Sequence, residues 1–400
     1  MTDEYDLIIV GGGLVGSSLA IALDGLPLRV ALIEAVDDQV RIASSAGDRA
    51  LAVSWGSAQI LDQLRIWAGA GAAAVPIKYI HVSDRGYIGK TRLSAQHEGV
   101  AALGYVISAR DLEKETCRVL AQTSVEKFCP ADVVGVTADH ERVHVSIKDG
   151  GVSKVMSARL LVGADGSNSV VRRCLEIAQH RKDYGQVAIV CEVETSRPNC
   201  FTAYERFTAT GPLAMLPTGK RKSAVVWTLS PGEAEERMVL PEAAFRDALQ
   251  NAFGYWLGQL KLVSRRVSFP LQRIRAAKMS AERVVLIGNA SHQVHPIGGQ
   301  GLNLGLRDVA VLAEMLLHQT GFALDIGEKT FLDKYAKSRK GDLDEVMGFT
   351  DTMVRIFSNT HAPLSLSRSL GLTALDLWGG ARSALARRAM GLKARLPRFV

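Results

Sequence analysis

The chain has 400 residues, of which 47% are hydrophobic and 22% charged, and a net charge of +7. This composition excludes a disordered chain and a coiled coil. No apolar run reaches the roughly 18 residues that span a bilayer, and the acidic residues 1–6 (MTDEYD) are unlike the basic start of a signal peptide. These features predict a cytoplasmic protein, and five scattered cysteines favour reduced thiols over a disulfide framework or a zinc site.

A glycine-rich loop lies close to the N-terminus. Residues 5–10 (YDLIIV) predict a buried strand, and residues 17–23 (SSLAIAL) predict a helix. In the Gly-x-Gly-x-x-Gly pattern between them, Gly11 permits a tight turn, Gly13 lets the backbone approach a pyrophosphate, and Gly16 lets the helix pack closely on the strand. The helix N-terminus would then face the phosphates.

The next strand supports a ligand rather than a bare turn. Residues 28–34 predict a strand that ends at Glu34, whose carboxylate could accept hydrogen bonds from ribose hydroxyls. Together these elements indicate an adenine dinucleotide, and this part of the sequence leaves FAD and NAD open.

A second loop follows the predicted strand at residues 160–163. Asp165 and Gly166 lie at its carboxyl end, where ligands of open α/β sheets bind. An isolated Asp-Gly pair is also a common β-turn.

The pattern changes between residues 174 and 270. Short β-rich runs at 187–193, 201–207, 211–217 and 223–229 are separated by turn residues, including Pro231-Gly232, and one helix is expected at 242–253. These runs predict an antiparallel sheet with one helix, and a further strand at 78–82 is expected to join it as a second domain that covers the cofactor. The run at 211–217 is expected to be a core strand, unless it borders the substrate side of the flavin, as the family resemblance described below implies.

A third loop follows the apolar run 284–287. Asn289 could bond a ribityl hydroxyl, and the amides of residues 298–302 would lie at a helix N-terminus, which suits a group that gains negative charge, such as a reduced isoalloxazine. For His292 and His295, a hydrogen bond that orders the loop is favoured over a catalytic base.

The C-terminal part is basic. From residue 377 onward it has no acidic residue and carries Arg382, Arg387, Arg388, Lys393, Arg395 and Arg398. Two interpretations stay open: an amphipathic contact with an anionic membrane, and a helical pair packed on the cofactor domain with its charge facing water. No compact basic-aromatic patch predicts nucleic-acid binding.

The three loops, in this order, resemble the FAD-dependent aromatic hydroxylases of the para-hydroxybenzoate hydroxylase type. The resemblance implies an α/β fold with a discontinuous Rossmann-like FAD-binding domain, a mixed β-sheet substrate domain and C-terminal helices. It implies that the pyrophosphate lies at Gly11–Gly16 and that the flavin ring lies against Pro296, Gly298, Gly299, Gln300, Gly301, Leu302 and Asn303. It also implies FAD contacts for Arg49 and Arg110, and contacts of Asp165-Gly166 with FAD and NAD(P)H. This chain has Asn289 where the family usually has Asp.

Further phrases are similar to the ubiquinone-biosynthesis branch, in particular to the 2-octaprenyl-6-methoxyphenol hydroxylases. They are residues 81–86 (HVSDRG), 204–208 (YERFT), 211–217 (GPLAMLP) and 301–308 (GLNLGLRD), together with Asn289. The resemblance implies that a polyprenylated methoxyphenol is hydroxylated to a 1,4-benzoquinol, with NAD(P)H as transient reductant and O2 as co-substrate, through a C4a-hydroperoxyflavin. It allows contact with other ubiquinone-biosynthesis proteins and peripheral contact with the inner face of the cell membrane.

Other functions stay open at this stage: a hydroxylase acting at another ring position, a flavin dehydrogenase, or a structural flavoprotein subunit. The expected division of the chain is an FAD-binding domain (1–75, 101–178 and 270–335), a substrate domain (76–100 and 179–269) and a C-terminal helical segment (336–400).

Overall fold

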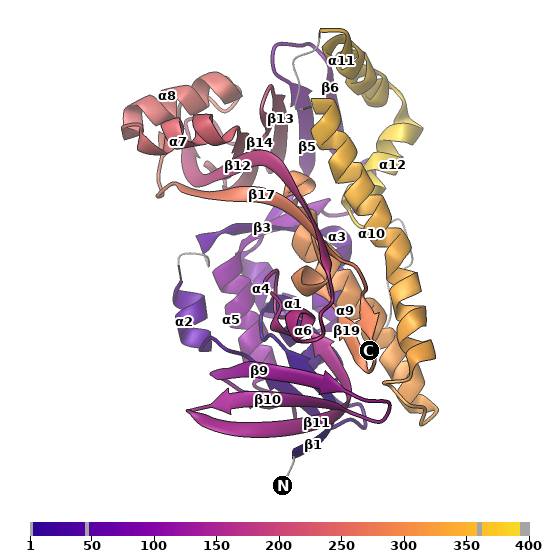
Figure 1. The fold of residues 1–400 in the computed structure, drawn as a ribbon. Coiled ribbons are helices and arrows are strands. Elements are labelled where there is room, and N and C mark those ends of the chain that lie inside the picture. The colour runs from indigo at the N-terminus through magenta and orange to yellow at the C-terminus, as the bar shows by residue number, and fades with distance from the viewer. Residues whose placement is uncertain (1–2, 45–47, 358–361, 393–400) are drawn as a thin grey trace.

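The computed structural model describes residues 3–44, 48–357 and 362–392. The lower half of the molecule in Figure 1 is built on a sheet in the order β18-β19-β11-β1-β2-β8, with β10 and β9 attached to β11. The central strands β19, β11, β1, β2 and β8 are parallel, so their carboxyl ends meet at one edge. The strands of this sheet are β1 (Asp3–Val10), β2 (Val30–Ile33), β8 (Glu126–Phe128), β9 (Ala131–Ala138), β10 (Val143–Asp149), β11 (Val152–Gly163), β18 (Ser280–Ala281) and β19 (Val284–Leu286).

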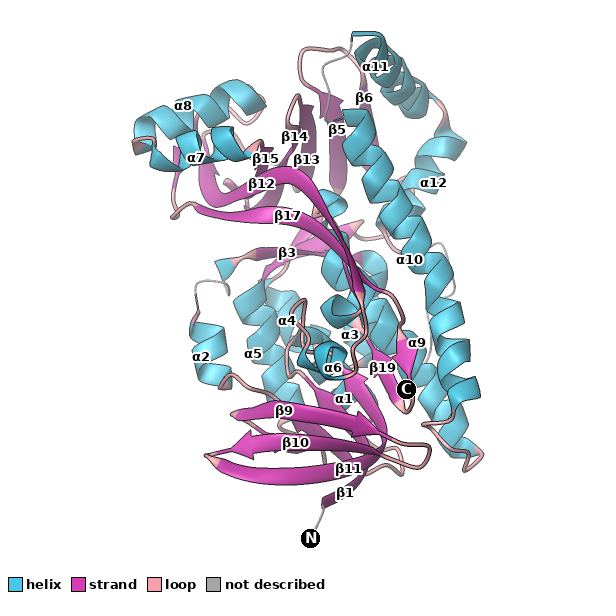
Figure 2. Ribbon diagram, in the orientation of Figure 1, coloured by secondary structure: helices cyan, strands magenta, loops and turns pink. Residues whose placement is uncertain are grey.

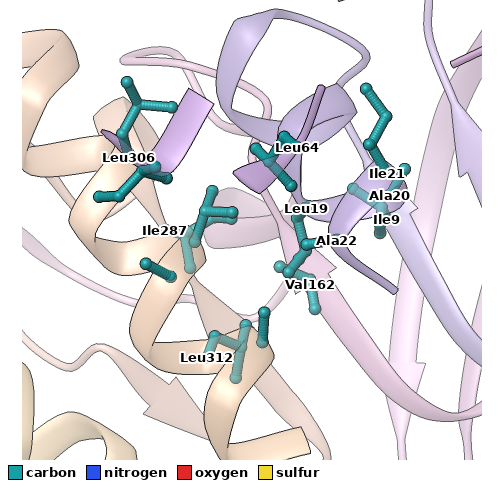
Figure 3. Packing of buried hydrophobic residues seen from close by; sticks show 14 of the residues in the cluster. Ile9, Leu19, Ala20, Ile21, Ala22, Leu64, Val162, Ile287, Leu306 and Leu312 are labelled. Atoms are coloured by element: carbon teal, nitrogen blue, oxygen red, sulfur yellow. The ribbon is translucent and has the colours of Figure 1, made fainter. Parts of the chain in front are cut away.

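The main hydrophobic core lies between this sheet and its helices. Figure 3 shows Leu19 of α1, Leu306 and Leu312 of α9, and Ile9 and Val162 of the sheet in one hydrophobic cluster, and all five side chains are fully buried. Burial of each such side chain stabilises the fold by ~1.5–3 kcal/mol. The helices of this half are α1 (Leu14–Ala22), α2 (Asp38–Ala43), α3 (Trp55–Gln63), α4 (Trp67–Ala70), η2 (Gly71–Ala73), α5 (Ala109–Leu120), α6 (Val170–Cys174), η3 (Gly288–Ala290), η4 (Ile297–Gly299) and α9 (Gln300–Gly321).

A second sheet forms the upper half, in the order β20-β17-β12-β15-β14-β13-β5-β6, with β16 paired to β12. It is mixed, because β5 runs parallel to β13 while the other pairs are antiparallel. Its strands are β5 (Tyr79–Asp84), β6 (Lys90–Ser94), β12 (Gln179–Thr195), β13 (Thr202–Thr208), β14 (Gly211–Gly219), β15 (Lys222–Leu229), β16 (Leu260–Leu262), β17 (Val267–Ala276) and β20 (His292–Gln293).

Two helices, not the single predicted one, accompany this sheet. Besides α8 (Glu242–Phe253), helix α7 (Pro231–Val239) begins where the sequence indicated a turn. Ser230 and Glu233 form a reciprocal capping box, and Pro231 suits the first helical position. The Pro231-Gly232 turn is therefore wrong, because capping chemistry starts a helix there.

The long strands β12 and β17 connect the two halves (Figure 2). Gln179–Asp183 pairs with Gln272–Ala276 near the lower sheet, and after a bulge the two strands continue into the upper sheet. A small sheet of β3 (Ala50–Ser54), β7 (Gly104–Ser108) and β4 (Val75–Ile77) contacts β14 of the upper sheet. The predicted fold class is confirmed. The numerical domain division stays a prediction, and helix α10 runs across residue 336 without a break.

The C-terminal helices are α10 (Lys329–Phe357), α11 (Ala362–Leu377) and α12 (Gly379–Ala389). Helix α10 packs on α9 at one end and reaches α11 at the other (Figure 1). Helices α11 and α12 pack on β6, and α11 also on β5. A buried ion pair of 2.9 Å between Arg368 of α11 and Asp84 of β5 anchors this contact.

The helical pair packs mainly on the upper sheet. The end of α12 also contacts the start of α3, where Gly56 N–H donates to the Met390 carbonyl at 2.8 Å, so the expected packing on the cofactor domain is found only at this end. Lys393, Arg395 and Arg398 of the basic tail lie outside the described residues. Among the helices that the structure describes, none is long and apolar enough to cross a bilayer.

Candidate active site

The first glycine loop forms a cradle at the carboxyl end of β1. Gly11 has a left-handed φ of +105°, and a Cβ on Gly16 would lie 1.9 Å from the Gly11 carbonyl oxygen, so helix and turn touch as predicted. Gly13 precedes α1, whose N-terminus has no side-chain cap. A Cβ on Gly13 would meet only the Arg41 guanidinium, at 3.9 Å. The uncapped helix end and the adjacent cation fit a pyrophosphate.

Arg41 was not found from the sequence. It donates to the Gly12 carbonyl and, at 2.8 Å, to Asp38, which holds the guanidinium beside the glycine loop. It lies on the short helix α2 outside any recognisable motif, so only the folded chain brings it here.

Glu34 lies just after β2, as expected. Its carboxylate accepts hydrogen bonds from the backbone N–H groups of Gly12 at 2.6 Å and Val36 at 2.8 Å. An ionised carboxylate has about four acceptor positions, so Glu34 retains capacity for the hydroxyls of a ribose.

The two predicted arginine contacts differ in their surroundings. Arg110 donates to Asp48 at 2.7 Å and to the carbonyls of Ile42 and Ser44, and so ties down the segment before β3. Arg49 is exposed, and its carbonyl accepts from Ala109 N–H at 2.9 Å. Both FAD contacts stay predictions, and the donors of Arg110 are largely used by the chain itself.

The second loop is joined to the third by a buried arginine. Asp165 Oδ2 accepts from the N–H groups of Val170 and Val171 at the start of α6, while Oδ1 is buried without a hydrogen-bond partner among the described residues. Gly166 has a φ of +78°. Arg172 donates to the carbonyls of Ser167 and Ala290, both at 2.7 Å. An unpartnered carboxylate oxygen at this edge fits a hydroxyl or amide donor of the cofactor.

The third loop presents backbone rather than side chains. Gly298 and Gly299 have φ values of +66° and +63°, and a Cβ on Gly299 would lie 2.7 Å from that of Ala52. Helix α9 then begins at Gln300 without a side-chain cap. The first N–H groups of a helix lack partners within it, so this turn offers donors to an anionic ring edge. Asn289, exposed just after β19, is free to meet a ribityl chain.

The other predicted residues of this loop hold its shape. Pro296 accepts from Gly299 N–H at 2.9 Å. The Asn303 amide donates to the carbonyls of Ala52 and Gly299 and accepts from Ser54 N–H at 2.9 Å, so its side chain ties the loop to β3. Gly301 and Leu302 lie in the first turn of α9, where only backbone N–H groups could meet the ring.

Behind this loop lies a buried charge network. The Asp308 carboxylate accepts from Gly288 N–H at 3.0 Å, from His292 Nε2 at 2.6 Å and from Arg339 Nε at 2.7 Å. Burial raises the pKa of Asp308, but the charges of His292 and Arg339 outweigh burial and hold the pKa well below its usual range. The loop-ordering interpretation of His292 is confirmed. Burial lowers the pKa of His295 to about 4, so that ring is neutral.

A cavity of about 650 Å³ adjoins the third loop. Its wall is mainly apolar and comes from parts of the chain that are distant in sequence: the flavin-facing loop, the small sheet of β3, β4 and β7, the strands β5, β6 and β13, and the helices α10, α11 and α12. Representative lining residues are Ile80, Val82, Leu93, Phe207, Ile297, Gly298, Phe349, Met353, Leu372 and Leu385. The contribution of the C-terminal helices was missed, because no local pattern indicates what a helix packs against.

Comparisons with known proteins agree with this geometry. The family described as FAD binding domain matches residues 4–350. A ubiquinone hydroxylase, UbiL, of Rhodospirillum rubrum is 35% identical over 96% of this chain and 89% of that protein. The chain belongs to the FAD-dependent aromatic hydroxylases. The 3-demethoxyubiquinol 3-hydroxylase of Escherichia coli is 28% identical over 98% of this chain and all of that protein.

The fold comparison points the same way. The crystal structure of a p-nitrophenol 4-monooxygenase from Pseudomonas putida has a TM-score of 0.80 at 18% identity, over 99% of this chain and all of that one. The predictions of a FAD-dependent monooxygenase and of the ubiquinone-biosynthesis hydroxylase branch are therefore confirmed. The predicted FAD cofactor is confirmed by the family match. The individual FAD contacts described above stay predictions.

Replacing Gly16 by alanine tests the first cradle. The added methyl group would collide with the Gly11 carbonyl and push α1 off the sheet. We expect a loss of ~1–3 kcal/mol in unfolding free energy and at least tenfold less bound FAD, measured by thermal unfolding and flavin absorbance. The control is Gly341→Ala in α10, where a Cβ meets nothing within 4 Å; it should stabilise by ~0.5–1 kcal/mol. Full FAD content in Gly16→Ala would contradict the cradle.

Replacing Asp308 by asparagine tests the network behind the flavin loop. The substitution removes the charge that pairs with the buried side chains of Arg339 and His292. We therefore expect the free energy of unfolding to fall by ~3–5 kcal/mol and FAD to be retained less tightly. The pKa of Asp308 is depressed in the folded state. The stabilisation that its ionised carboxylate gives to the folded protein is therefore fully present above the ordinary carboxyl pKa of about 4, and it should be lost only in stronger acid. Chemical unfolding at neutral pH measures it. Asp333→Asn, an exposed change on α10, is the control and should be neutral.

Proposed function

We propose that this chain hydroxylates the ring of a polyprenylated methoxyphenol in ubiquinone biosynthesis, converting a 2-polyprenyl-6-methoxyphenol to the 1,4-benzoquinol. The observation that carries the proposal is the mainly apolar cavity of about 650 Å³ that extends from the flavin-facing loop to the C-terminal helices. A phenol with a hydrocarbon tail needs such a space, because its ring must reach the flavin while its tail stays out of water. The names of the relatives support a substrate of this class.

The chain's own residues would bind and orient FAD and would exclude water from the site. The cradle at Gly11–Gly16 and Arg41 would hold the pyrophosphate, Glu34 the ribose, and the amides before α9 the ring edge. Bound FAD supplies the transfer of two electrons from NAD(P)H and the activation of O2. One oxygen atom enters the ring and the other leaves as water. The apolar wall of Val82, Leu93 and Phe207 would keep water out, which protects a reactive oxygen species from decay.

A second candidate is hydroxylation at another position of the same kind of ring. One relative reported above is named for hydroxylation at position 3, and the cavity wall is mainly apolar. We infer that position is set by how the methoxy group and tail pack against the wall.

The reaction class has a direct test. Purified enzyme with bound FAD is supplied with NADPH or NADH, 18O2 and a 6-methoxyphenol that carries a short prenyl chain at position 2. We expect a product that is heavier by one 18O atom, and the position of the new hydroxyl, read by NMR, separates the two candidates. Substrate-stimulated NAD(P)H oxidation without 18O in the product would instead favour a dehydrogenase. Neither oxidation nor product would favour a structural flavoprotein.

We also propose a peripheral site at the inner face of the cell membrane, through the corner between α11 and α12. Leu377 is 82% exposed and Trp378 72% exposed at this corner, and Arg382 follows in α12. An exposed tryptophan and leucine beside basic residues suit a membrane interface with anionic lipid. The same helices line the cavity, so a tail could pass from lipid to the site over a short path.

Charge substitution tests this corner without opening the cavity. Leu377→Glu combined with Trp378→Glu should reduce flotation with phosphatidylglycerol-containing vesicles several-fold, because both side chains would lose their apolar contact with lipid. Phe322→Glu, at a residue that is 76% exposed beyond the C-terminal end of α9, is the matched control. Equal flotation of all three proteins would rule out the corner as the contact.

A further inference from the structure

The upper sheet turns a row of apolar side chains toward the cavity, and one carboxylate interrupts the row. Side chains alternate along a strand, and Glu205 and Phe207 of β13 both line the cavity. Glu205 pairs in register with Val82 of β5, which pairs with Thr91 of β6. Ile80 and Leu93 continue the same wall. The two residues that pair with Glu205 across the sheet, Val82 of β5 and Ala214 of β14, have hydrocarbon side chains.

The alternate residues of β13 serve a different purpose on the other face. Tyr204 packs against Phe253 and Trp256 at ring distances of 5.6 and 6.1 Å, and the Arg206 guanidinium lies 5.5 Å from the Trp256 ring. Arg206 is therefore not placed on the cavity side to neutralise Glu205.

The other charged groups in the cavity wall all have partners. Arg307 binds Asp342 at 2.7 Å, Arg388 binds Glu345 at 3.0 Å, and Arg368 binds Asp84 at 2.9 Å. Glu205 has no hydrogen bond or ion pair with any residue that the structure describes. Glu205 is half-buried, and an unpaired acid in a mainly apolar wall is costly to a fold unless it has a use.

We propose that Glu205 is the base that accepts the proton of the substrate's phenolic hydroxyl in this cavity. The assignment rests on the proposed function, because it needs a phenol as the substrate. A phenol attacks an electrophilic oxygen atom far better once its O–H proton has begun to leave. The O–H bond breaks, the proton passes to a carboxylate oxygen of Glu205, and the electron pair left on the phenol oxygen delocalises into the ring. After the oxygen atom has joined the ring, the attacked carbon loses its hydrogen as a proton to water, and the phenol oxygen regains the proton held by Glu205, so the quinol leaves and the carboxylate is restored.

The basicity of Glu205 suits this step. Burial raises its pKa to about 7, whereas an ordinary glutamate has a pKa of about 4.3 and a phenol about 10. A carboxylate with this pKa is still largely ionised at slightly alkaline pH, yet it is a much stronger base than an exposed one. A base with a pKa near the working pH typically contributes ~10²–10⁴-fold to the rate.

The first test is the pH profile of the FAD-loaded enzyme with the short-chain 2-prenyl-6-methoxyphenol. In the wild type, kcat/KM should rise with pH through about 7, as the carboxylate forms. Glu205→Gln should lower kcat ~10²-fold or more and lose this rise, while Glu205→Asp should keep the rise at a reduced rate. Glu194→Gln, an exposed change on β12 of the same sheet, should behave as the wild type. A wild-type profile in Glu205→Gln would overturn the assignment.

The second test needs no turnover. Binding of the same phenol to the oxidised enzyme is measured by quenching of flavin fluorescence. Binding to the wild type should tighten several-fold as pH rises through about 7, and binding to Glu205→Gln should not change. The methyl ether of the phenol, which cannot donate a proton, should bind both proteins equally at high pH. If the binding of the phenol and of the ether depended equally on pH, the assignment of Glu205 as the base would be wrong. Failure of the wild type to form an 18O product would instead overturn the proposed function, and the binding titration would then decide the role of Glu205 alone.

Discussion

The active site depends on one buried carboxylate. Asp308 bonds the backbone of Gly288 after β19, the ring of His292 in the third loop and the guanidinium of Arg339 in α10. These groups come from separate elements, and hydrogen bonds to a buried charge are strong and directional. Arg339 also binds Asp342 of the cavity wall at 2.8 Å. The loop that would face the flavin and the wall that would face the substrate are therefore positioned by the same ion network.

The network and the cavity illustrate two opposite uses of low dielectric. Around Asp308, every buried charge has a partner, so low dielectric strengthens the pairing and fixes the loop. Around Glu205, apolar neighbours leave the charge without compensation, so low dielectric weakens ionisation and makes the carboxylate a stronger base. Catalytic sites often combine a fully paired ion network with an acid that has no charge partner.

The parts of the site that the sequence could predict are those whose chemistry is local. Gly11 and Gly16 are a few residues apart, and Glu34 follows them at a fixed distance along the chain. The sequence pattern alone therefore locates these residues. The turn at Gly298 needs a left-handed backbone conformation, which glycine adopts readily. The pair of glycines in the sequence therefore also predicts this turn.

The rest of the site is made by packing. Arg41 and Glu205 lie within ordinary helix and strand patterns. The fold places Arg41 beside the uncapped N-terminus of α1 and places Glu205 in the wall of an apolar cavity. The phrase at residues 204–208 was identified from resemblance alone, without a role for its acid. The tail was interpreted from its charge, but its position is decided by the buried pair of Arg368 with Asp84, a contact between residues remote in sequence.

That position changes what the C-terminal helices mean for function. Had α11 and α12 only covered the cofactor domain, their loss would affect stability, and membrane contact would be a separate property. Instead they close the cavity on one side and expose Leu377 and Trp378 on the other. A truncation before α11 would open the apolar wall to water and would remove the exposed corner at the same time, so it could not separate catalysis from membrane contact. Point changes at the corner can, because neither Leu377 nor Trp378 lines the cavity.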